Sequence, residues 1–152
     1  MKLLLVYATN SGSCFLVAER IVEILKVKHQ VTVQLSARTT PNDLDGFNAI
    51  ILGTPSWSVE GQEGYPHETM LKLIRTCAGR NFSTKRFALY GCGDNSYTFF
   101  CGAVDHLENF VSAAHGQNIL EPLRIDSYYF DLKNNNKLVD EWAEKVMRLL
   151  HA

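Results

Sequence analysis

Near the start of the chain lies the segment LLLVYATNSGSCFLVAERIVEIL, residues 3–25. It begins with consecutive apolar residues, which is typical of a strand that is covered on both faces. A loop of hydroxyl side chains, an amide and one glycine follows. Apolar side chains then recur at helical spacing, at Cys14, Val17, Ile21, Ile24 and Leu25. The segment therefore predicts a buried strand, a loop and a helix that packs back on the strand, as in an α/β fold.

The same alternation continues along the chain. Further strands are predicted at residues 31–35, 49–52, 87–90 and 119–125, the last interrupted by Pro122. Further helices are predicted at residues 71–78, 104–114 and 139–149, with a weaker one at residues 41–45. There is no linker or internal repeat. The pattern predicts one domain over residues 1–152, a doubly wound α/β domain with a five-stranded parallel sheet and helices on both faces.

The composition limits the class of protein. Of 152 residues, 46% are hydrophobic and 20% charged, so the chain can bury a compact core and is not disordered. No apolar run reaches the roughly 18 residues of a membrane helix, and the first residues lack an export-signal pattern, so we expect a soluble cytoplasmic protein. Lys and Arg number 15 against 16 Asp and Glu, which argues against a nucleic-acid partner.

The four cysteines, at positions 14, 77, 92 and 101, form no CxxC pair and have no histidine-rich partner segment. This spacing argues against a zinc site. Because a core of this size needs no disulfide, we expect reduced thiols and no bound metal.

Ligands of doubly wound sheets bind beyond the carboxyl ends of the strands, so the loop after the first strand is a candidate site. It consists of Thr9, Asn10, Ser11, Gly12, Ser13 and Cys14. Its hydroxyls and the free N–H groups of the following helix suit an anion such as phosphate. The alternative is an ordinary N-cap by Ser11 or Asn10. The loop has no Walker A lysine, and it has no GxGxxG pattern, which disfavours classical dinucleotide binding.

The loops after the third and fourth predicted strands, residues 53–61 and 91–101, each present a large aromatic side chain among small residues. These are Trp57 and Tyr97. At the edge of a crevice, one ring from each side would hold a flat ligand between them. The alternative is that both rings simply cap the core.

The segment YGCGDNSYTFFCGAVD, residues 90–105, resembles the Y-G-C-G-D-x-S-Y-x-x-F-C-G-A-V-D signature of short-chain flavodoxins. The first loop is related to their T-x-T-G-x-T motif, and the resemblance covers the whole chain. It implies a flavodoxin-like sandwich with strand order 2-1-3-4-5. It also implies non-covalently bound FMN and a role as a low-potential one-electron carrier between redox proteins, without catalytic residues of its own.

Carried over by position, the resemblance assigns residues 9–14 to the FMN phosphate. It places Ser56 and Trp57 against the ribityl chain and the inner ring face, and Tyr97 on the outer face. The backbones of Asp94, Phe99 and Cys101 would bind the pyrimidine edge. The remaining predicted contacts are Pro55, Ser58, Cys92, Gly93 and Phe100. Two residues depart from the family pattern: Cys14 replaces the commoner Thr, and Ser58 replaces Gly.

Acidic residues collect in the segments that would surround the cofactor, at Asp43, Asp45, Glu60, Glu63, Glu68, Asp94, Asp105 and Glu108. Neither residues 43–68 nor residues 91–108 contain a Lys or Arg. We therefore expect a negative cofactor edge on a near-neutral monomer, where a reductase donor and an oxidoreductase acceptor dock. The alternatives are an FMN-dependent reductase or ribonucleotide-reductase activator, and a cofactor-free binding module. A phosphoacceptor receiver domain is disfavoured because the acidic residues it requires after the first and third strands are missing.

Overall fold

The structure is a computed structural model that describes residues 1–96 and 98–151. One sheet runs through it, and its strands are β1 Lys2–Tyr7, β2 Gln30–Leu35, β3 Ala49–Val59, β4 Gln62–Pro66, β5 Arg86–Gly93, β6 Gln117–Asn118 and β7 Leu123–Asp126. The helices are α1 Ser13–Leu25, α2 Pro41–Asp45, α3 Glu68–Thr76, α4 Gly102–Ala113 and α5 Leu132–His151, with short 3₁₀ turns η1 Ser36–Arg38 and η2 Tyr128–Asp131.

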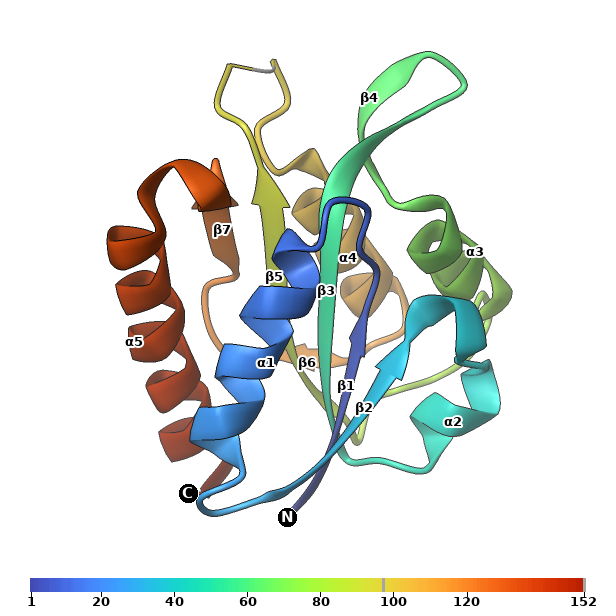
Figure 1. Cartoon of the computed structure of the whole chain (residues 1–152). Coiled ribbons are helices and arrows are strands. Elements are labelled where there is room, and N and C mark those ends of the chain that lie inside the picture. The colour runs from blue at the N-terminus through green and yellow to red at the C-terminus, as the bar shows by residue number, and fades with distance from the viewer. Residues whose placement is uncertain (97, 152) are drawn as a thin grey trace.

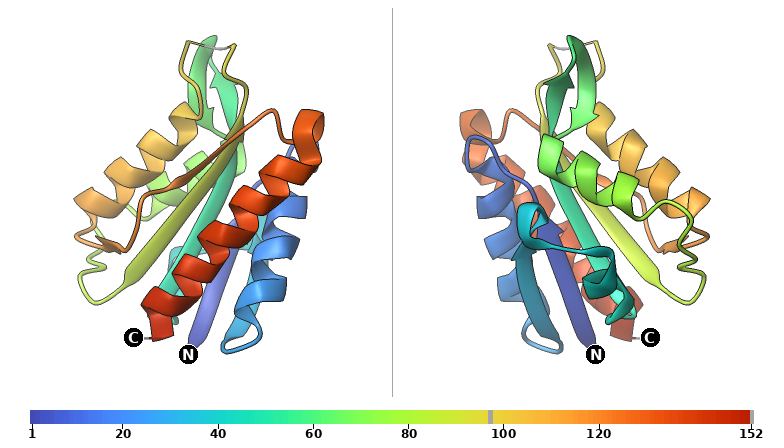
Figure 2. Two further views of the ribbon diagram at one scale, coloured as in Figure 1. Left: turned by 90° about the vertical axis from the view of Figure 1, so that its left-hand side faces the viewer. Right: turned by 90° about the vertical axis from the view of Figure 1, so that its right-hand side faces the viewer.

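Helices cover both faces of the sheet (Figures 1 and 2). Along β1, Leu3 and Leu5 join the core cluster under α1 and α5, whereas Leu4 and Val6 join the cluster that includes side chains of α3 and α4. This alternation explains why β1 is apolar at consecutive positions. The predicted α/β fold with helices on both faces is confirmed.

The parallel part of the sheet has the order β2-β1-β3-β5-β6, and β7 also pairs with β5. In terms of the five predicted strands this is 2-1-3-4-5, with the fifth strand split in two. The expectation that residues 119–125 form one strand is wrong for residues 119–122, which lie between β6 and β7. Pro122 has no N–H to donate to β5, and regular pairing resumes at Leu123.

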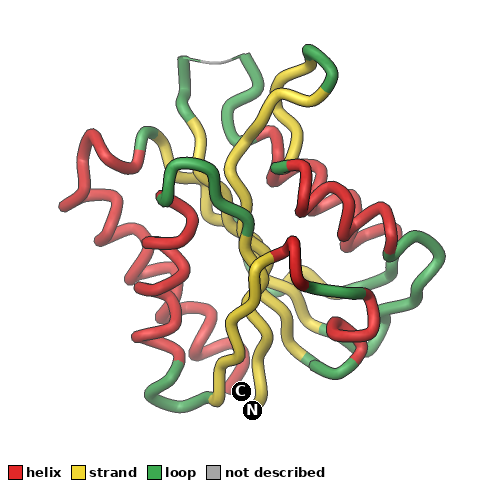
Figure 3. The backbone as a smooth tube through the Cα atoms, turned by 45° about the vertical axis from the view of Figure 1, so that its right-hand side comes forward, coloured by secondary structure: helices red, strands yellow, loops and turns green. Residues whose placement is uncertain are grey.

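A second difference concerns residues 53–61, which we expected to form a loop. Instead, β3 continues past the parallel sheet and turns back as β4, so that Trp57 lies opposite Tyr65 in an antiparallel pair. The reversal occurs at Glu60 and Gly61, which both have positive φ, 52° and 78°. Two successive positive φ values are typical of a tight hairpin turn. The hairpin and the loops after β1 and β5 project from the same end of the sheet (Figure 3).

Within the described residues, no helix combines the length and the apolar content needed to cross a lipid bilayer.

Candidate functional site

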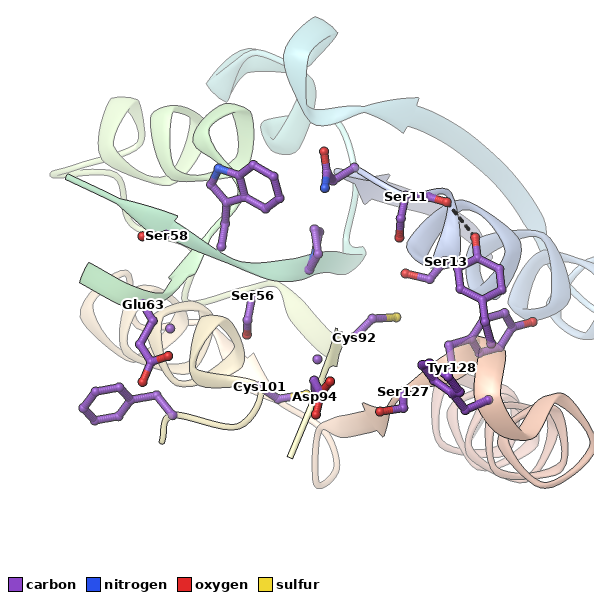
Figure 4. A pocket seen from close by; sticks show the side chains of 18 residues that line it. Ser11, Ser13, Ser56, Ser58, Glu63, Cys92, Asp94, Cys101, Ser127 and Tyr128 are labelled. Carbon is purple, nitrogen blue, oxygen red and sulfur yellow. Dashed lines mark hydrogen bonds between the residues drawn. The ribbon is translucent and has the colours of Figure 1, made fainter. Parts of the chain in front are cut away.

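A cavity of about 540 Å³ lies at the carboxyl ends of β1, β3 and β5 (Figure 4), a size typical of small-molecule sites. Its lining brings together these residues predicted from the sequence: Asn10, Ser11, Ser13, Pro55, Ser56, Trp57, Ser58, Cys92, Gly93, Asp94, Phe99 and Cys101. Four other predicted residues, Thr9, Gly12, Cys14 and Phe100, are not part of the lining. Tyr97 lies outside the described residues.

The loop after β1 leads into α1 with Gly12 as the N-cap, at φ 92° and ψ −9°. The Gly12 N–H donates to Thr9 Oγ1 at 3.0 Å, and this bond between two residues of the loop stabilises its conformation. The alternative of a side-chain cap by Ser11 or Asn10 is wrong, because no side chain caps this helix. The N–H groups of Ser13, Cys14 and Phe15 therefore have no acceptor among the described residues. They form an electropositive helix start next to the hydroxyls of the cavity wall.

Buried thiols lie beneath this loop. Cys14 is fully buried, and its side chain is not part of the cavity lining. Only its backbone N–H contributes to the free helix start. Burial and the neighbouring thiol of Cys92 hold the pKa of Cys14 well above its usual range. Burial likewise raises the pKa of Cys101 to about 12. All four cysteines are buried and unpaired. Burial also raises the pKa of Cys77 to about 11, so the thiols of Cys14, Cys77 and Cys101 are protonated and unreactive near neutral pH.

The β3–β4 hairpin forms one wall of the cavity. Trp57 is half-buried and contacts the ring of His67, with the ring centroids 5.7 Å apart. Gly64, on β4, has φ 81°, and a Cβ at this position would lie 2.8 Å from Cβ of Phe99. Only glycine allows the hairpin to approach the loop after β5 so closely.

The loop after β5 is held by side chains from neighbouring elements. Asp126 Oδ1 accepts from the Asn95 N–H at 3.0 Å, and Arg124 Nη1 donates to the Cys101 carbonyl at 3.0 Å. The Ser96 N–H donates to the exposed Asp94 carboxylate at 2.8 Å and lowers the pKa of Asp94. Ser56 Oγ accepts from the Ala103 N–H at 3.2 Å, which joins the hairpin wall to the start of α4.

Six lining residues are not among the cofactor contacts predicted from the sequence: Glu63, Gly64, Ser127, Tyr128, Tyr129 and Phe130. The last four follow β7, whose carboxyl end lies at the same edge of the sheet as those of β1, β3 and β5. A search of the loop after the fifth predicted strand would have found them, because all parallel strands end at this edge.

The expected acidic edge is smaller than the sequence suggested. Arg124 Nη2 donates to Asp105 at 2.7 Å and to Glu108 at 3.0 Å, so these two carboxylates are paired with a cation. Asp45 pairs with Arg80, which follows α3. Asp43 accepts the Thr40 N–H and serves the capping box of α2. Of the remaining acids, Glu63 and Asp94 line the cavity, whereas Glu60 and Glu68 line a neighbouring hollow together with Lys72 and Arg75. Of the described residues that line the cavity, none is Lys or Arg.

The described residues contain no cluster of His, Cys, Asp and Glu side chains that could hold a metal ion.

Comparison with known proteins gives consistent matches. The family model described as Flavodoxin matches residues 5–135. The chain is 31% identical to a flavodoxin of Nitratidesulfovibrio vulgaris over 98% of its own length and 99% of that protein. Oxidised flavodoxin 2 from Bacillus cereus superposes with a TM-score of 0.85 at 24% identity, covering 95% of this chain and 96% of that chain. A Fusobacterium nucleatum flavodoxin bound to flavin mononucleotide superposes with a TM-score of 0.82 at 19% identity, covering 97% of each chain.

Proposed function

Since this chain belongs to the flavodoxin family, we propose that its cavity holds FMN with the phosphate at the start of α1 and the ring beside the β3–β4 hairpin. The protein is an electron-transfer protein that carries electrons on FMN. The single sheet with one core on each face acts, in this proposal, as one FMN-binding domain.

The observation that carries the proposal is the free helix start beside the cavity. The N–H groups of Ser13, Cys14 and Phe15 have no acceptor among the described residues. The side chains of Ser11 and Ser13, which carry hydroxyls, line the adjoining cavity. No described lining residue is a cation, so N–H groups, hydroxyls and the helix dipole balance the phosphate charge. This donor set fits a phosphate monoester.

The rest of the cavity fits a flat ring. Trp57 supplies an aromatic face, and Cys92 and Gly93 belong to the end of β5, which borders the same cavity. Tyr97, carried over from the resemblance, is proposed for the opposite face. The backbone N–H groups of Asp94, Phe99 and Cys101 are proposed to bind the polar edge of the ring. Cys101, with φ 48°, is fixed as the N-cap of α4 by the bond from Arg124 to its carbonyl.

When bound, FMN accepts and releases single electrons. The chain sets how readily it does so through local charge and access to water. Glu63 and Asp94 are the carboxylates in the described lining, and no cation there balances them, so they disfavour added negative charge on the ring and favour a low potential. Trp57 excludes water from one side of the ring and thereby weakens the solvation of that charge.

We also propose that the redox partners dock at the mouth of the cavity, where Glu63 and Asp94 of the lining and Glu60 at the hairpin turn favour a partner with a basic face. A reductase would supply the electron and an oxidoreductase would take it. The protein acts as a monomer in this proposal. Four unpaired thiols are typical of a reducing compartment, which supports a cytoplasmic location.

The test is to reconstitute the purified chain with FMN and to identify the flavin that heat releases from it. We expect one FMN per chain, with the absorbance of a bound flavin. A chain that binds no flavin, or that binds FAD in preference, would contradict the proposal.

A further inference from the structure

The 3₁₀ turn η2 lies at the edge of the cavity, beside the loop that follows β1. Tyr129 Oη donates to the Ser11 carbonyl at 2.7 Å, the bond drawn as a dashed line at Ser11 in Figure 4. A Cβ added at Gly12 would lie 3.1 Å from the same hydroxyl. Tyr129 therefore lies directly against Ser11 and Gly12, although it comes 118 residues after Ser11 in the chain.

Tyr129 is held in place by its neighbours. The buried Tyr128 contacts it edge to face with the ring centroids 5.5 Å apart, and Tyr128 Oη donates to Asn136 Oδ1 at 2.6 Å. The amide of Asn135, itself buried, reaches the carbonyls of residues 126, 127 and 128 at 3.2, 3.4 and 3.2 Å. The start of α5 thus fixes the turn that carries Tyr129.

The Ser11 carbonyl and the Gly12 N–H belong to one planar peptide unit. Thr9 Oγ1 accepts from its N–H end and Tyr129 Oη donates to its carbonyl end. Two opposed bonds therefore set the orientation of this peptide. Because glycine tolerates many backbone conformations, the peptide rotates at little cost once one bond is lost. A rotated peptide would place its carbonyl oxygen on the side where the Gly12 N–H now meets Thr9 Oγ1, and the loop that leads into α1 would lose its present conformation.

We propose that Tyr129 is a positioning residue, which orients the Ser11–Gly12 peptide so that the start of α1 is ready to receive the phosphate of the cofactor. The inference rests on the proposed function and deepens it. If only a fraction of the molecules have the loop in its binding conformation, the apparent affinity for the ligand is reduced by that fraction. A loop that is already in this conformation therefore binds the phosphate more tightly.

The test compares Tyr129→Phe with the parent by titration calorimetry of the apoprotein with FMN and with riboflavin, which lacks the phosphate. One hydrogen bond is worth about 0.5–1.5 kcal/mol, so the affinity for FMN should fall between about twofold and about tenfold. The affinity for riboflavin should not change. Tyr65→Phe is the matched control, because its hydroxyl donates to Gln62 Oε1 at 3.1 Å and Tyr65 is not in the cavity lining. It should behave like the parent.

A second measurement follows the loop itself. In the apoprotein, hydrogen exchange of residues 9–16 should be faster in Tyr129→Phe than in the parent, and inorganic phosphate should slow it less.

The outcomes separate the inference from the proposed function. If the parent binds FMN and Tyr129→Phe binds FMN with the same affinity, the inference is wrong and the proposed function stands. An equal loss of affinity for FMN and riboflavin also overturns it, because Tyr129 would then only pack the cavity wall. A parent that binds neither flavin contradicts the proposed function.

Discussion

Removing the phosphate from the cofactor should cost this protein most of its affinity. The perturbation is riboflavin in place of FMN, which keeps the ring and the ribityl chain. The start of α1 offers three N–H groups, those of Ser13, Cys14 and Phe15, that have no acceptor among the described residues. A hydrogen bond to a charged group contributes roughly 1.5–3 kcal/mol. If only two of the three N–H groups engage, the phosphate contributes at least about 3 kcal/mol, or about 150-fold in affinity.

The assay is calorimetric titration of the apoprotein at fixed ionic strength and several pH values. A phosphate monoester dianion takes up one proton near pH 6 and becomes a monoanion, so the affinity for FMN should fall as the pH drops below about 6. The affinity for riboflavin should stay flat over the same range, because riboflavin has no phosphate to titrate. Equal affinity for the two ligands, or a parallel pH dependence, would refute the assignment of the helix start to the phosphate.

The remaining predictions concern the ring, the edge and the thiols. Trp57→Ala should weaken FMN binding by several-fold, since aromatic stacking contributes about 0.5–1.5 kcal/mol beyond burial. It should also raise the fluorescence of the bound flavin, and unchanged fluorescence would mean that the indole does not touch the ring. Substituting Glu60 and Glu63 by Gln should slow reduction by a basic reductase in stopped-flow measurements at low salt. Above 0.1 M ionic strength the screening length falls below about 10 Å, so the effect should disappear. An equal effect at all salt concentrations would rule out electrostatic docking. Arg124→Gln leaves two carboxylates unpaired and should lower the free energy of unfolding in urea by about 1 kcal/mol, less at high salt; the same loss at all salt concentrations would assign the effect to packing. The Cys101 thiol, with its pKa raised to about 12 by burial, is almost wholly protonated at pH 8, so Ellman's reagent should label it only after unfolding.

The sequence allowed the parallel sheet and the first loop to be predicted because their signals are local. The apolar run of β1 and the helical spacing of α1 lie within one short segment, and the hydroxyls between them mark the proposed anion site. Most of the predicted cavity lining on this loop and on the ends of β3 and β5 follows from one rule, that parallel strands share a carboxyl edge.

The hairpin could not be predicted in the same way. Trp57 and Tyr65 pair across a turn at Glu60 and Gly61, and a glutamate with positive φ is not a strong turn signal. The segment around Trp57 is rich in Pro, Ser and Gly, so it is more typical of a loop than of a strand. What holds it as a hairpin is contact with the loop after β5, where Gly64 meets Phe99.

The charge pattern failed for a related reason. Counting acids along residues 91–108 treats neighbours in the sequence as neighbours in space. Arg124, on β7, reaches back to Asp105 and Glu108, and this pairing depends on β7 lying beside β5. Tyr129 contacts Ser11 for the same kind of reason, since η2 follows β7 at the cavity edge.

The most direct test of the central claim is an anaerobic reductive titration of the FMN-loaded protein, followed by absorbance. A one-electron carrier should take up two electrons in two separate steps, with the second at the lower potential because Glu63 and Asp94 oppose the added charge. Glu63→Gln should raise that second potential. A single two-electron step in the parent would contradict the account, and so would a second potential that Glu63→Gln leaves unchanged.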